Sequence, residues 1–83
     1  MVYEVELSDS ALKELSKLEH SLQERIVKTL ERIRIRPEAY LTKLVGDSYY
    51  RLRVGDYRLI IDIEYAKLIL LVIKIGHRKN IYD

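Results

Sequence analysis

The chain has 83 residues, a formal net charge of +2 and no cysteine, and 48% of its residues are hydrophobic. This length accommodates one small domain, residues 1–83, with a real but modest core. The lack of cysteine excludes a disulfide framework and a thiolate metal site, and two histidines are too few for a histidine-rich metal site.

Charged and apolar residues are distributed unevenly along the chain. Residues 1–40 carry one more acidic than basic residue, whereas residues 41–83 carry three more basic than acidic residues. A polyanion site should therefore be sought first in the second half. The longest apolar run, residues 68–73, is too short to span a bilayer. Residues 1–5 lack the basic and apolar stretches of a signal peptide, and we therefore expect a cytoplasmic protein.

The first half of the chain predicts one strand and two helices. Residues 2–7 alternate apolar and polar side chains, which is typical of a half-buried strand. Residues 8–10, Ser-Asp-Ser, are good helix N-caps, and they precede apolar positions at helical spacing, namely Leu12, Leu15 and Leu18. Ser21 and Glu24 then fit a capping box for a second helix. That helix buries Leu22, Ile26, Leu30 and Ile33 and ends before Pro37.

The second half predicts three strands over residues 49–54, 57–64 and 68–75, which are rich in β-branched and aromatic residues. Gly55-Asp56 suits a type II′ hairpin turn, and Ala66-Lys67 is the expected second connection. The third run is apolar on both faces and predicts a central strand covered on two sides, with Gly76 as the point where the chain turns away. The order β-α-α-β-β-β predicts an α+β domain with a helical hairpin packed on one face of a mainly antiparallel sheet.

The two-residue turn brings three arginines together. It pairs Arg53 with Arg58 and Arg51 with Ile60, and because side chains alternate across a strand, the arginines share the face away from the helices. One interpretation is a solvated face whose charges are neutralised by Asp56 or Asp62. The other is a phosphate site, because like charges directly opposite weaken a sheet and the planar fork of arginine suits phosphate oxygens. The sequence leaves both open.

Two further basic features have a structural and a functional interpretation. His77, Arg78 and Lys79 follow the last strand, with Tyr82 behind them to stack on a base or donate a proton, but they also fit a frayed polar tail. Along the second helix runs a basic stripe, which favours a solvated surface because glutamates interrupt it. Its residues are Arg25, Lys28, Arg32 and Arg36. His20 is expected in the turn between the helices.

Taken together, these segments resemble the RelE family of toxins, ribosome-dependent mRNA interferases within the RelE/ParE superfamily. The resemblance rests on the stretches SDSALKELSKL, KLVG, YRLRVGDYRLII and VIKIGHRK in this order. Its most specific part is a Y-R-L strand followed about eighteen residues later by G-x-R. The chain is rich in Ile, Glu, Lys and Arg and poor in Asn, Gln and Met. Together with the resemblance, this composition favours an archaeal or thermophilic member of the family.

The resemblance implies the toxin of a type II toxin–antitoxin system, an endoribonuclease that cleaves mRNA in the ribosomal A site without metal or cofactor. Attack by a ribose 2′-OH on its own 3′-phosphate would leave a cyclic phosphate. The implied partners are a RelB-like antitoxin, the ribosome and mRNA, and operator DNA for the complex. The implied catalytic residues are Arg51, Arg53, Arg58, Arg78 and Tyr82, and the implied RNA-binding residues are Lys43, His77 and Lys79.

One departure from the family concerns the general base. Family members often carry lysine where this chain has Arg51 and Arg53, and an arginine cannot lose its proton. His77, Tyr82 and ribosomal RNA are the candidates, of which Tyr82 is preferred as acid/base or stacking group. The alternatives to a nuclease are a ParE-like inhibitor of DNA gyrase and a catalytically inactive binding module.

Overall fold

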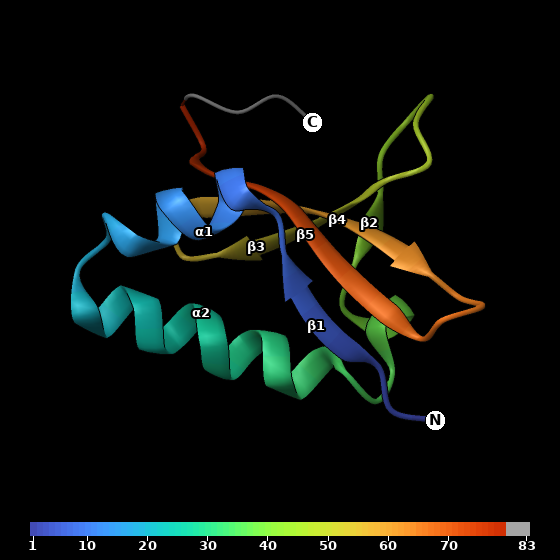
Figure 1. Cartoon of the computed structure of the whole chain (residues 1–83). Coiled ribbons are helices and arrows are strands. Elements are labelled where there is room, and N and C mark those ends of the chain that lie inside the picture. Colours follow the sequence, from blue (N-terminus) through green and yellow to red (C-terminus); the bar gives the residue numbers. More distant parts are fainter. Residues whose placement is uncertain (80–83) are drawn as a thin grey trace.

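The computed structural model describes residues 1–79, which form two α-helices, one 3₁₀ turn and a sheet (Figure 1). Residues 80–83, and with them Tyr82, lie outside the described part. The helical elements are α1 (Asp9–Ser16), α2 (His20–Ile33) and η1 (Pro37–Ala39). The strands are β1 (Glu4–Leu7), β2 (Thr42–Lys43), β3 (Tyr50–Val54), β4 (Tyr57–Glu64) and β5 (Ile69–His77). None of these helices is long and apolar enough to cross a membrane.

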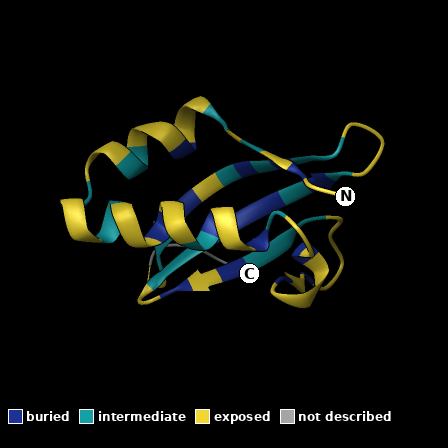
Figure 2. Cartoon of the chain, turned by 90° about the horizontal axis from the view of Figure 1, so that it is seen from below, coloured by how far each residue is buried: buried dark blue, intermediate teal, exposed yellow. Residues whose placement is uncertain are grey.

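The sheet has the strand order β1-β5-β4-β3-β2, and both helices pack on one of its faces (Figures 1 and 2). β1 runs parallel to β5, and every other neighbouring pair is antiparallel. This confirms the predicted α+β architecture. The short edge strand β2 was not predicted, because two residues are too few to show an alternating pattern.

Helix α1 begins as the sequence predicts. The Ser8 hydroxyl accepts a hydrogen bond from the Ala11 backbone N–H at 3.1 Å and donates one to the Ile73 carbonyl at 2.7 Å. Ile73 lies at an irregularity of β5, where the partners of Ile60 and Ile61 are Lys74 and Val72. The N-cap of α1 therefore also satisfies the carbonyl of a bulged strand residue.

The predicted capping box of α2 is wrong. The helix starts at His20, so that Ser21 and Glu24 already lie inside it, and Glu19 at the N-cap makes no side-chain hydrogen bond. The turn is closed instead by Gln23, whose side-chain amide donates to the carbonyls of Leu15 and Leu18 at 2.9 and 3.1 Å. Capping the end of α1 in this way lets α2 begin two residues earlier than the sequence pattern indicates.

The core lies between the helices and the sheet. From α2, Ile26, Leu30 and Ile33 are buried as predicted, and they pack in one cluster with the inward residues of the strands. These are Leu52, Val54, Leu59, Ile61, Ile63, Leu70, Val72 and Ile75. Leu12 was expected in this core but is 57% exposed, because the turn of α1 that faces the sheet places the fully buried Ala11 there.

The last strand differs from prediction at its end. Gly76 does not turn the chain away, because β5 continues through Gly76 and His77, which pair with Arg58 and Tyr57 of β4. β5 is flanked by strands on both sides, as predicted for a central strand. Its helix-facing residues are buried, and those on the other face, such as Leu71, are only half-buried.

Candidate functional site

The β3–β4 hairpin has the predicted turn and register. Gly55 has a φ of +59°, and among the described residues Leu68 is the only non-glycine with a positive φ, so Asp56 is not in the left-handed region. A positive φ at the first turn residue alone defines type II′. The register pairs Arg53 with Arg58, as expected for a two-residue loop.

The hairpin places Arg51, Arg53 and Arg58 on the side of the sheet away from the helices, which we call the arginine face. Their neighbours Leu52 and Leu59 are buried toward the helices, which fixes the direction of the alternation. Arg53 is exposed, whereas Arg51 and Arg58 are half-buried, and the Nε atom of Arg58 is shielded from solvent. The sheet thus presents three guanidinium groups on one surface, as predicted.

Lys74 belongs to the same face and was missed by the sequence analysis. It lies opposite Ile60 in the β4–β5 register, is exposed, and is the diagonal neighbour of Arg58 across the two strands. The register of β5 could not be read from its largely apolar sequence, and the irregularity at Ile73 shifts it further. Gly76, directly opposite Arg58, adds no side chain to this part of the face.

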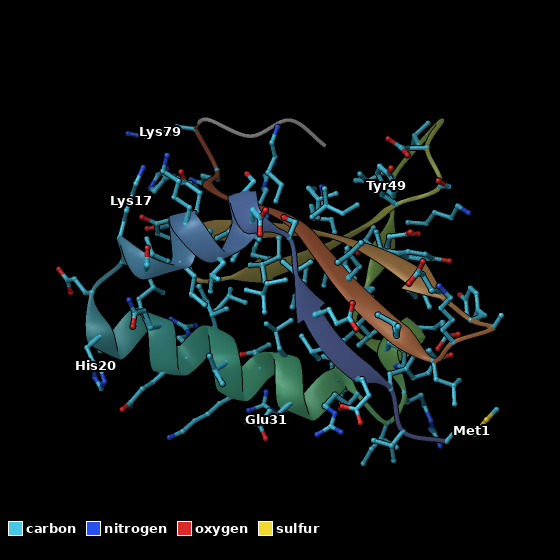
Figure 3. All side chains as sticks on the ribbon, viewed as in Figure 1. Met1, Lys17, His20, Glu31, Tyr49 and Lys79 are labelled. Atoms are coloured by element: carbon cyan, nitrogen blue, oxygen red, sulfur yellow. The ribbon has the colours of Figure 1, made fainter. Side chains whose placement is uncertain are left out.

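The loop between β2 and β3 forms a wall beside the arginine face. Leu44 and Tyr49 pack on Ile60 in a small second cluster, separate from the main core. The Leu44 N–H donates to the Tyr49 carbonyl at 3.0 Å, which closes the base of the loop, where Tyr49 is labelled in Figure 3. Since Ile60 pairs with Arg51, this wall stands directly beside the first arginine of the face.

Arg78 is held at the same end of the sheet as Arg53 and Arg58. Its backbone N–H donates to the Asp56 carbonyl at 2.9 Å, which ties the residue after β5 to the β3–β4 turn. The structure therefore brings the four predicted arginines to one hairpin and its immediate neighbour.

His77, Lys43 and Lys79 are not brought onto this face. His77 pairs with Tyr57 and shares its helix side, where the two rings meet edge-on with centroids 5.4 Å apart. Lys43 pairs with Tyr50, and its ammonium lies 5.5 Å from the centroid of that ring, also on the helix side. Lys79 is exposed and points outward at the end of the described chain (Figure 3).

Neither His77 nor the pair Tyr50 and Tyr65 supplies a proton acceptor to the arginine face. Tyr65 and Tyr50 share a hydrogen bond of 3.2 Å at the opposite end of β4, and this bond raises the pKa of Tyr65, so that its phenol stays protonated. Among residues 1–79 there is also no group of three or more His, Asp or Glu side chains that could hold a metal ion. The face can hold and neutralise an anion, and its arginines cannot accept a proton.

Known proteins share this fold and sequence pattern. Residues 5–82 match the family described as "ParE toxin of type II toxin-antitoxin system, parDE". The mRNA interferase toxin RelE of Escherichia coli K12 is 33% identical, with 96% of this chain and 87% of the relative covered.

Two solved complexes contain similar chains. The intact E. coli RelBE toxin–antitoxin complex gives a TM-score of 0.78 at 30% identity, covering 90% of this chain and 95% of the other. The archaeal RelE–RelB complex from Pyrococcus horikoshii OT3 gives 0.81 at 25% identity, covering 98% and 100%. The likeness spans nearly the whole described domain in both cases.

Proposed function

Because the chain belongs to the RelE/ParE family of toxins of type II toxin–antitoxin systems, we propose that it is an endoribonuclease that cleaves mRNA in the ribosomal A site and thereby inhibits translation. The relative named mRNA interferase, at 33% identity, supports this activity. The observation that carries the proposal is the arginine face, which places several permanent cations around one hairpin.

The pairing of Arg53 with Arg58 is the strongest single argument for phosphate binding. In a hairpin with a two-residue loop, the pair next to the turn is hydrogen-bonded and the following pair is not, which brings its Cα atoms to about 4.5 Å. Like charges on directly opposite residues of a sheet are unfavourable, and a phosphate bound between the two side chains would interact favourably with both. A phosphate offers the matching geometry for two planar forks.

The proposed reaction uses the RNA's own nucleophile. The ribose 2′-oxygen forms a bond to the adjacent phosphorus while the bond to the 5′-oxygen of the next nucleotide breaks, which leaves a 2′,3′-cyclic phosphate and a 5′-hydroxyl. The 2′-hydroxyl gives up one proton and the leaving oxygen gains one. Arg51, Arg53, Arg58 and Arg78 would stabilise the negative charge of the crowded phosphorus, which is usually the largest contribution in such sites.

The proton transfers need a group other than an arginine. His77 stands on the helix side with Tyr57, so we assign the acid–base or stacking role to Tyr82, with ribosomal RNA as the alternative source of the base. The partners we propose are a RelB-like antitoxin, on the basis of the solved RelBE and RelE–RelB complexes, and for the complex an operator DNA. The proposed location is the cytoplasm.

A second candidate function is inhibition of DNA gyrase, because the matching family is described as ParE toxin. Primer extension on an mRNA in a translating extract separates the two. Cleavage within codons that requires ribosomes supports the nuclease. Intact mRNA together with gyrase-dependent DNA breaks would assign the chain to the second function, and neither effect would leave a catalytically inactive binding module.

A further inference from the structure

A second cationic surface lies beside the arginine face. An open groove of about 550 Å³ runs between α2 and the end of β3, and we call it the α2 groove. Its cations are Arg25, Lys28 and Arg32 of the helix and Arg53 of the strand. The three helical residues are exposed. Figure 2 shows that exposed residues make up much of α2. The stripe that the sequence indicated as a solvated surface thus borders the candidate site.

The groove and the arginine face are continuous through Arg53. β2 pairs only with Tyr50 and Arg51 of β3, and within residues 1–79 no strand pairs along the outer edge of residues 52–54. The sheet is therefore open where Arg53 stands, and this residue belongs to both surfaces. A chain lying on the arginine face can pass over this edge into the groove.

Arg25 reaches the hairpin turn itself. A Cβ on Gly55 would stand 3.2 Å from Arg25 Nη1, so the guanidinium lies against the turn. The same turn holds the Arg78 backbone through the Asp56 carbonyl. The Arg25 side chain of α2 and the Arg78 backbone after β5 therefore both contact this turn.

The lining of the groove favours a polyanion over a peptide. Glu24 is its only carboxylate, and that group lies 3.5 Å from His20 Nδ1. Val54 is its only apolar side chain, so the groove offers no pocket in which a protein partner could bury the apolar anchor that tight interfaces rely on. Attraction by several cations without apolar anchoring is the pattern of sequence-independent nucleic-acid binding.

We propose that the α2 groove binds the phosphates of a ribonucleotide chain outside the reacting nucleotide, as an extension of the arginine face. Arg25, Lys28 and Arg32 follow one another at intervals of three and four residues, so they stand about 5–6 Å apart along the helix. This spacing lets successive phosphates meet successive cations. The inference rests on the proposed function for the nature of the ligand, and its test does not require cleavage.

The test compares Lys28→Gln/Arg32→Gln with Lys13→Gln/Lys17→Gln, which removes the same charge from exposed positions on and next to α1. The probe is a fluorescent single-stranded RNA dodecamer with 2′-O-methyl groups, which cannot be cleaved, and Kd is measured by anisotropy over a range of salt. Losing two phosphate contacts should reduce the magnitude of the slope of log K against log salt concentration by about 1.4. It should also weaken binding about tenfold at low salt. The α1 variant should match the unmodified chain.

Unchanged Kd and slope in the α2 variant, at an unchanged thermal midpoint, would overturn the proposal. It would also be overturned if that variant lost affinity for a poly-glutamate peptide and kept full affinity for the RNA, since the groove would then be an acidic-peptide site. If the α2 variant unfolds, single Lys28→Gln and Arg32→Gln variants should each lower the slope by about 0.7.

Co-sedimentation with purified ribosomes identifies the source of the RNA. Weaker sedimentation of the α2 variant without mRNA assigns the groove to ribosomal RNA, and weaker sedimentation only with mRNA assigns it to the message. Either result supports RNA binding in the α2 groove.

The outcomes also separate this proposal from the proposed function. If the unmodified chain fails to cleave mRNA while the α2 variant still loses dodecamer affinity, the nuclease proposal fails and the proposal of RNA binding in the groove stands. If the unmodified chain cleaves mRNA while the α2 variant keeps its dodecamer affinity, the nuclease proposal stands and the proposal of RNA binding in the groove fails.

Discussion

Arg53 and Arg58 lie directly opposite each other on neighbouring antiparallel strands, and their side chains share the open face of the sheet. Such a like-charge pair lowers stability by some tenths of a kcal/mol, up to about 1 kcal/mol. We therefore expect Arg53→Gln to raise the free energy of unfolding by that amount and to reduce mRNA cleavage. Urea denaturation and primer extension measure the two effects. Lys67→Gln, in the exposed β4–β5 loop, is the control and should change neither. A destabilised Arg53→Gln variant would contradict the repulsion argument.

Arg58 and Arg78 should be needed for cleavage but not for folding. Removing one charge-stabilising donor from an active site typically costs about 10²–10³-fold in rate, so Arg58→Ala and Arg78→Ala should each abolish detectable cleavage in a translating extract. Neither residue belongs to the core, and the circular dichroism spectrum should stay that of the unmodified chain. Lys13→Ala on α1 serves as the control for removal of a surface charge. Normal cleavage by both variants would mean that the site lies elsewhere.

Ser8 should contribute more to stability than its small size indicates. Ser8→Ala removes the N-cap of α1 and leaves the Ile73 carbonyl without its side-chain donor, and we expect a loss of about 1–2 kcal/mol in thermal or urea unfolding. The matched control is Ser16→Ala at the other end of α1, whose exposed hydroxyl donates only to the Lys13 carbonyl. That change should stay within about 0.5 kcal/mol. Equal losses from the two substitutions would argue against the cap.

Two glycines separate backbone strain from the contact with Arg25. Gly46 and Gly55 both have a positive φ, of +74° and +59°, so alanine at either position should cost about 1–2 kcal/mol. Only at Gly55 does the new Cβ meet Arg25, whereas Gly46 faces open space. Gly55→Ala should therefore also weaken binding of the 2′-O-methyl RNA, and Gly46→Ala should not. Identical RNA affinity in the two variants would mean that the position of Arg25 is irrelevant to binding.

Most features that follow from short-range rules were predicted from the sequence, with the capping box of α2 as the exception. The general architecture was also predicted, but details that depend on packing between elements were not. A two-residue loop determines the pairing of Arg53 with Arg58 without knowledge of the rest of the fold. In contrast, whether Ala11 or Leu12 faces the core depends on how α1 is oriented on the sheet, and in the structure Ala11 is buried and Leu12 exposed.

The same distinction holds within the candidate site. Lys74 joins the arginine face only because of where β5 pairs with β4, and the edge of β3 beside Arg53 is open because β2 pairs only with Tyr50 and Arg51. Neither register leaves a signal in strands as apolar as β5 or as short as β2. The placement of Gly76 inside β5 was missed for the same reason, since pairing with Arg58 overrides its tendency to break a strand.

The parallel pairing of β1 with β5 joins the two most distant strands of the sequence, and the Ser8–Ile73 hydrogen bond spans a separation of 65 residues. During synthesis β1 has no strand to pair with until β5 has been made, so closing the sheet is a late, non-local step. Lys74 and Arg78 arrive with that same segment. For the proposed nuclease, we therefore expect that a growing chain cannot cleave mRNA until its last strand has emerged from the ribosome.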